Sequence, residues 1–295
     1  MTSAADFTSG KGHRDENFPV ASRLVRAELR PAILAFYRFA RTADDVADHA
    51  TASAEQKLAQ LDRLEAGLRG QAGMGVEGEI LRSTLQARNL TDRHARDLLE
   101  AFRRDVTKRR YADWSELMDY CRFSAAPVGR FVLDLHGESD ALWPLNDALC
   151  AALQVINHLQ DCAKDYRNLD RVYIPLDRLG VEGLAVDCLS ARQASPELRR
   201  VIVGLARQAG ALLDRSRPFA ERIADRRLAL EVGVIQALAE GLVRRLERRD
   251  PLSERVHHGA VETTGLALRG GIVVAMRRLV RAVGARQPGL RGSRG

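Results

Sequence analysis

The chain has 295 residues, of which 45% are hydrophobic, so it is long and apolar enough for one large domain with a buried core. Its formal net charge of +7 comes almost wholly from arginine, but 39 acidic residues are interleaved with the arginines and only 5% of residues are aromatic. No stacking platform or recognition motif accompanies the charge, so an anionic small molecule or a membrane surface suits it better than nucleic acid.

Helical periodicity dominates the chain and strand-like alternation is nearly absent, which predicts an all-α fold. Pro31 is a good first residue for the first long helix, which runs into an acidic cluster near residue 45. Later helices are predicted at 54–69, 77–88, 91–108, 114–136, 140–165, 196–224, 227–248 and 260–283. Thr91 and Ser195 are expected to start helices, and residues 113–116 are typical of a capping box.

Two aspartate clusters with the same spacing lie within these helices, at residues 44–48 and 161–165. In each cluster two carboxylates stand four residues apart, so they share one helix face with Cβ atoms roughly 6 Å apart. Stacked like charges are unfavourable unless a cation occupies the gap. Mg²⁺ prefers oxygen ligands and is commonly shared with substrate phosphates. Two such faces turned toward one another would bind a diphosphate through bridging metal ions.

Ordinary solvated ion pairs are the alternative for either cluster alone. Arg41 precedes Asp44 by three residues and Asp45 by four, while Lys164 and Arg167 flank the second cluster. Two clusters of one geometry, each set in an apolar helical run, favour the metal site over a surface role.

A glycine-rich segment at residues 73–78 matches the dinucleotide fingerprint G-x-G-x-x-G letter for letter. That site requires a preceding strand within a βαβ unit, whereas the preceding run from Leu58 to Leu68 is helical. We therefore predict a helix–helix loop here and no nicotinamide site.

No linker-like or low-complexity block interrupts the middle of the chain. We expect a single domain over residues 15–284, with a flexible tail at 1–14 and a basic flexible tail at 285–295.

The four cysteines show neither a C-x-x-C pair nor metal-ligand spacing, and no secretory signal or apolar stretch of about 18 residues occurs. We expect reduced core thiols in a cytoplasmic protein that is soluble, or peripheral at the inner face of the membrane. The basic run from Arg277 to Arg294 would suit contact with acidic headgroups; a plain solvated tail is the alternative.

Over roughly residues 15–250 the sequence resembles the squalene/phytoene synthase family of all-α isoprenoid synthases. The resemblance is carried by residues 37–48, by Tyr120-Cys121 leading to Gly129, and by residues 154–161. It implies a single-domain helical bundle around a central apolar cavity. Within the family, residues 16–22 and 157–161 resemble the bacterial hopanoid-pathway branch called HpnC, whose members are hydroxysqualene synthases.

The resemblance implies a magnesium and diphosphate site built from both clusters. Two or three Mg²⁺ ions would be held by Asp44, Asp48, Asn157, Asp161 and Asp165. The substrate would also contact Tyr37, Arg41, Gln154 and Asn17, and Gln154 lies on the same helix face as the second cluster. Tyr120 matches a tyrosine beside the reacting carbons, where it would steady a carbocation; for Tyr37 and Tyr120 a role as core aromatics is the alternative.

Four departures from the family pattern bear on this site. Asn17 and Pro19 stand where relatives carry a serine-rich stretch, and Gln160 replaces an arginine that often precedes the second cluster. Residues 125–127 replace a glycine-containing sequence, and beyond residue 250 the family's C-terminal tyrosine and basic residues find no match.

By this resemblance, the chain would convert presqualene diphosphate to hydroxysqualene with Mg²⁺ and without NAD(P)H. The nearest alternative is the condensation of two farnesyl diphosphates to presqualene diphosphate or squalene. An inactive family member acting as a scaffold is a second alternative, which the intact aspartates disfavour. A basic nucleic-acid or membrane-binding protein is the third. We also expect contact with other enzymes of the pathway.

Overall fold

The structure is a computed structural model that describes residues 24–285. Over this range the chain forms helices and no strand, and an isolated bridge between Arg110 and Val172 is its one β-type pairing. The predicted all-α fold is confirmed. The α-helices are α1 (Arg30–Ala47), α2 (Ala54–Leu68), α3 (Val76–Gln86), α4 (Arg93–Thr107), α5 (Trp114–Ser124), α6 (Ala126–Leu135), α7 (Trp143–Leu169), α8 (Leu176–Val181), α9 (Pro196–Ser216), α10 (Phe219–Arg222), α11 (Arg226–Leu246) and α12 (Ala260–Ala285).

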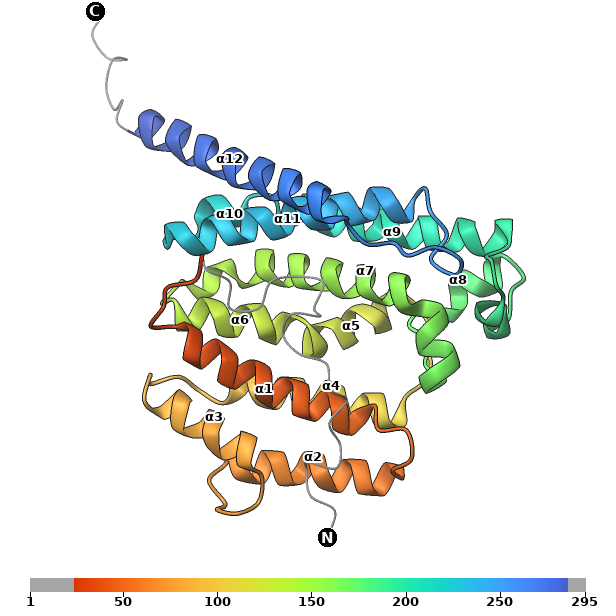
Figure 1. Cartoon of the computed structure of the whole chain (residues 1–295), viewed down its shortest axis with the longest axis horizontal. Helices are drawn as coiled ribbons and strands as arrows, with labels where there is room; N and C mark the ends of the chain where they lie inside the picture. Colours follow the sequence, from red (N-terminus) through yellow and green to blue (C-terminus); the bar gives the residue numbers. More distant parts are fainter. Residues whose placement is uncertain (1–23, 286–295) are drawn as a thin grey trace, which may run out of the picture.

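The helices lie in successive layers (Figure 1), with α2 and α3 at one side, α1 and α4 next, α5 to α7 in the middle, α9 to α11 beyond them and α12 outermost. Two buried apolar clusters fill the layers, one among α1 to α4 and one from α5 through α11. Phe131 of α6 joins the first cluster, where its ring stacks on that of Phe36 with centroids 4.0 Å apart. The middle layer therefore packs against both sides of the molecule.

Helix starts follow side-chain capping only in part. Ser195 begins α9 as predicted, with its hydroxyl accepting from the Leu198 N–H. Asp113 accepts from the N–H of Glu116, but the Glu116 carboxylate turns to Ala112, so only half of the predicted capping box forms. The prediction at Thr91 was wrong, because α4 begins at Arg93.

Prolines and a left-handed residue account for the differences in helix length. The predicted helix 114–136 is broken at Ala125, and α6 then begins at Ala126 with Pro127 in its first turn. The predicted helix 196–224 is broken before α10 at Pro218. α7 continues four residues beyond Asp165 and ends at Leu169, where its C-cap Asp170 has a left-handed φ of +51°.

The glycine-rich segment 73–78 joins α2 to α3 as predicted, with residues 73–75 in the loop and residues 76–78 in the first turn of α3. Gly75 is the N-cap of α3, and a Cβ on Gly78 would lie 2.3 Å from the Leu64 carbonyl oxygen. Close packing of α3 on α2 explains these glycines.

Gly129 sets the approach of α6 to α7, so Gly129→Ala should be destabilising. A Cβ there would lie 1.9 Å from Asn146 Oδ1 and 2.8 Å from Cys150 Sγ, and Asn146 is buried and bonded to the Ala126 carbonyl. We expect a loss of about 1–3 kcal/mol in urea unfolding. Gly204→Ala in α9, where a Cβ meets nothing within 4 Å, is the matched control and should not lose stability. Equal unfolding midpoints for both variants and the native chain would contradict the close approach.

Candidate active site

A cavity of about 450 Å³ lies between α1, α5, α6, α7 and α11. Most of its wall is apolar; among the side chains that line it are Phe36, Phe131, Leu149, Leu153, Leu228 and Ile235. Its polar lining includes five of the predicted site residues, Tyr37, Arg41, Asp44, Gln154 and Asn157. α1 and α7 end on the same side of the molecule (Figure 1), so the two acidic clusters lie toward one end of this apolar cavity.

The guanidinium of Arg41 bonds two carboxylates of the first cluster at once. Its Nη1 lies 2.9 Å from Asp44 Oδ2 and its Nη2 lies 2.6 Å from Asp45 Oδ1. Asp45 is buried, whereas 38% of the Asp44 side chain is exposed. For the first cluster, the ion pairs considered as the alternative to a metal site do form, but they engage Asp44 and Asp45, while Asp48 pairs with Arg171.

The two clusters act on each other electrostatically. Burial, Asp161 and Asp48 together raise the pKa of the Asp165 carboxyl to about 7, and Lys164 and Arg171 oppose the shift. Burial and Asp48 likewise raise the pKa of Asp44, against the effect of Arg41. Because Asp48 at the C-terminal end of α1 acts on Asp165 of α7, the two acidic clusters lie within electrostatic range of each other.

The donor set fits Mg²⁺, since it consists of carboxylate oxygens and the amide oxygen of Asn157. Between residues 24 and 285, no three His, Cys, Asp or Glu side chains converge closely enough to hold an ion by themselves. An ion here would complete its coordination with water and with oxygens of a bound phosphate, as Mg²⁺ commonly does.

A buried group of hydrogen-bonded side chains, centred on Asp105, lies beside the aspartate clusters and was not predicted from the sequence. Asp105 of α4 accepts hydrogen bonds from the Tyr120 hydroxyl at 2.7 Å and from the Tyr173 hydroxyl at 2.8 Å. His158 stacks on Tyr173 with ring centroids 3.5 Å apart, and its Nε2 lies 3.1 Å from Gln154 Nε2. Burial raises the pKa of Asp105 to about 6, while Arg171 and the two tyrosines lower it.

Tyr120 itself is 3% exposed and is not among the residues that line the cavity. The structure thus places it in the aromatic core with its hydroxyl paired, the alternative considered from the sequence. Its role beside the reacting carbons stays a prediction. Tyr37 lines the cavity.

Arg171 links the two acidic helices to α4. Its guanidinium bonds Asp48 Oδ1 at 2.5 Å, the Ala47 carbonyl at 3.1 Å and the Asp105 carbonyl at 3.0 Å. Only 8% of the Arg171 side chain is exposed. In the sequence, Arg171 lies between the predicted helices at 140–165 and 196–224, where no contact could be assigned to it. The apolar run 172–174 directly after Arg171 was the one local sign that this arginine enters the core.

The loop after α11 reaches the second cluster. Gln160 donates to the Val256 carbonyl and is buried, so it faces this loop. Burial and Arg255 lower the pKa of His257, while Asp161 acts to raise it, which places the His257 ring within electrostatic range of Asp161. Asn17 lies outside the described residues, as do residues 1–14 and most of the predicted C-terminal tail.

An all-α bundle around an apolar cavity, with Arg41, Asp44 and Asn157 in its polar lining, has the fold of an isoprenoid synthase of the squalene synthase type. The model of the squalene/phytoene synthase family matches residues 12–262. The chain belongs to this family and is an enzyme of isoprenoid biosynthesis.

Named relatives agree with this assignment. The chain is 55% identical to a hydroxysqualene synthase of Rhodopseudomonas palustris over 262 residues, which cover 89% of this chain and 90% of that protein. It is also 55% identical to a hydroxysqualene synthase of Zymomonas mobilis over 266 residues, 90% of each chain. The crystal structure of squalene synthase HpnC from Alicyclobacillus acidocaldarius superposes with a TM-score of 0.69 at 35% identity, covering 78% of this chain and 87% of that one.

Proposed function

We propose that this enzyme converts presqualene diphosphate to hydroxysqualene with the help of Mg²⁺. The single observation that carries the proposal is the cavity, which is apolar over most of its wall and carries Arg41, Asp44 and Asn157 where the two acidic helices end. Its shape and polarity suit a long hydrocarbon with a diphosphate headgroup. The relatives named hydroxysqualene synthase support the choice of reaction within the family.

Asp44, Asp48, Asp161, Asp165 and the Asn157 amide would hold Mg²⁺. When bound, Mg²⁺ supplies positive charge that stabilises a departing diphosphate.

Arg41 adds fixed donors to the same headgroup. Because Asp44 and Asp45 already orient its guanidinium, binding a phosphate oxygen costs little further ordering of that side chain. Tyr37 and Gln154 line the cavity nearby and would position the carbon chain against the headgroup.

The chemistry needs only water besides the substrate. The carbon–oxygen bond to diphosphate breaks, the cation rearranges, and a water oxygen bonds to carbon as its proton leaves. No reductant enters this balance, so we propose that the reaction runs without NAD(P)H. The apolar wall keeps bulk water away from the cation until rearrangement is complete.

Product analysis tests the proposal against its nearest alternative. The purified enzyme is incubated with presqualene diphosphate and, separately, with farnesyl diphosphate, each with and without Mg²⁺ and NADPH. We expect hydroxysqualene from presqualene diphosphate only when Mg²⁺ is present, with no effect of NADPH. Presqualene diphosphate or squalene formed from farnesyl diphosphate would favour the condensation instead, and no turnover of either substrate would favour the scaffold.

A further inference from the structure

An apolar stripe lies exposed along α12. Leu268, Ile272 and Met276 stand four residues apart on one helix face and are 63%, 57% and 62% exposed. Exposed side chains of this size in a row are unusual on a soluble protein and mark an interaction surface.

The opposite face of α12 is fixed to the body of the protein. A Cβ on Gly270 would lie 2.5 Å from the Gly233 carbonyl oxygen, and Val274 is 5% exposed against the same glycine of α11. α12 is the outermost helix (Figure 1), so the anchored side holds the stripe toward the outside.

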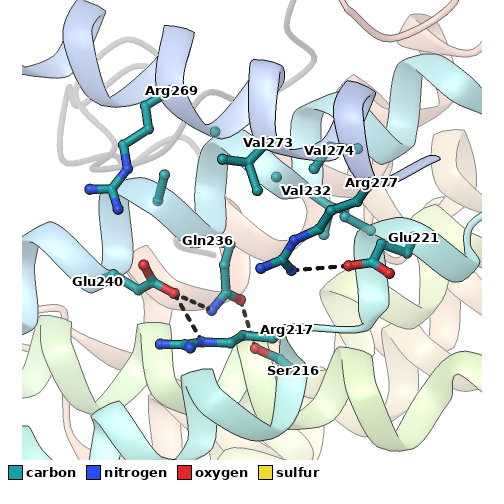
Figure 2. A pocket seen from close by; sticks show the side chains of 14 residues that line it. Ser216, Arg217, Glu221, Val232, Gln236, Glu240, Arg269, Val273, Val274 and Arg277 are labelled. Carbon is teal, nitrogen blue, oxygen red and sulfur yellow. Dashed lines mark hydrogen bonds and ion pairs between the residues drawn. The ribbon is translucent and has the colours of Figure 1, made fainter. Parts of the chain in front are cut away.

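Arginines border the stripe. Figure 2 shows Arg269 and Arg277 of α12 at a hollow of about 190 Å³ that lies between α12 and α11. Arg277 pairs with Glu221 at 3.0 Å, and Arg278 donates to carbonyls at the end of α10. Arg269 is exposed and has no ionic partner among residues 24–285. In the sequence no acidic residue follows Glu262, whereas seven arginines do.

We infer that α12 docks the enzyme on the surface of an anionic lipid bilayer. Leu268, Ile272 and Met276 would enter the boundary between headgroups and acyl chains, and Arg269 and Arg277 would contact lipid phosphates. None of the helices described between residues 24 and 285 is long and apolar enough to cross a bilayer, so contact through this surface is interfacial.

Charge argues for lipid over a second copy of the chain. A twofold contact through the stripe would apply the same surface to itself and bring the bordering arginines of both copies close together. The acidic residue of α12, Glu262, is already paired with Arg245 and offers no compensation. An anionic bilayer meets both the apolar stripe and its positive borders.

Vesicle co-sedimentation tests this inference. Native enzyme is compared with the triple variant Leu268→Ser, Ile272→Ser, Met276→Ser and with the double variant Arg269→Gln, Arg277→Gln. The matched control is Val76→Ser, Val181→Ser, which removes two other exposed valines, 69% and 82% exposed, from α3 and α8. Circular dichroism and thermal unfolding establish that each variant is folded.

We expect native enzyme and the valine control to bind vesicles containing phosphatidylglycerol, and to bind phosphatidylcholine vesicles far less. The triple variant should lose roughly tenfold or more in partition constant, and binding of native enzyme should weaken with added salt. The double variant should lose binding only to the anionic vesicles. The inference is overturned if the native enzyme does not bind anionic vesicles, or if the triple variant binds them as well as the native enzyme does. It is also overturned if light scattering shows a dimer of the native enzyme that the triple variant abolishes.

Discussion

Asp161→Asn is expected to reduce turnover of the diphosphate substrate by at least about 10²–10³-fold. Asp161 lies within electrostatic range of Asp165, on which it acts to raise the pKa, and α7 brings both residues to the side where α1 ends. Asparagine preserves the size of the side chain but removes the negative charge that a divalent cation requires. The loss should therefore appear in catalysis and in Mg²⁺ dependence, not in folding.

Initial rates over a Mg²⁺ titration measure this effect. The variant should need more Mg²⁺ than native enzyme, and chelation with EDTA should abolish native turnover reversibly. Asp177→Asn is the matched control, because Asp177 lies on α8 and its one ion pair among residues 24–285 is with its neighbour Arg178 at 3.6 Å. Native-like rates for Asp161→Asn would remove the second cluster from the active site, whatever the identity of the product.

Arg171→Met is expected to lower the free energy of unfolding by about 3 kcal/mol or more. The substitution keeps an apolar stem of similar length but removes the guanidinium, which leaves two backbone carbonyls without their donor and Asp48 without its cation. Asp105 also loses the positive neighbour that opposes the rise in its pKa.

Urea unfolding followed by circular dichroism measures this loss. Arg200→Met is the matched control, because Arg200 is 57% exposed and pairs with Glu182 and Glu197 at the surface, where ion pairs contribute at most about 1 kcal/mol. Arg171→Lys keeps the charge without the planar fork and should fall between native and methionine variants. An equal loss of unfolding free energy in Arg171→Met and Arg200→Met would show that the buried hydrogen bonds of Arg171 stabilise the fold no more than a surface ion pair does.

The sequence predicted those parts of the site that depend on local spacing. Asp44 and Asp48, and Asp161 and Asp165, are one helical turn apart, so their shared faces follow from helix geometry alone. Arg41 was placed beside its acidic partners by the same argument. The all-α fold follows from helical periodicity along the chain. The connection between two helices around residues 73–75 follows from the helical run that precedes it, and both predictions are confirmed.

What the sequence did not predict depends on contacts between distant segments. Asp48 and Arg171 are 123 residues apart in the chain, and Asp105 and Tyr173 are 68 apart. No local pattern pairs them, because a buried polar side chain is identified only by the elements that cover it. The break between α5 and α6 at Ala125 differs, because Pro127 in the first turn of α6 was a local signal that the predicted helix 114–136 ran past.

The Arg171 linkage has a consequence for substrate length. One guanidinium ties the end of α1 to α4 and to the segment after α7, so under the proposed function the residues around the headgroup would be held in place independently of the apolar wall. Swapping bulky side chains deep in the hydrocarbon-binding end would then change which prenyl chains fit while leaving the ionisation step untouched. Under the proposed function, recognition of the hydrocarbon tail and chemistry at the headgroup would then be separable by mutation.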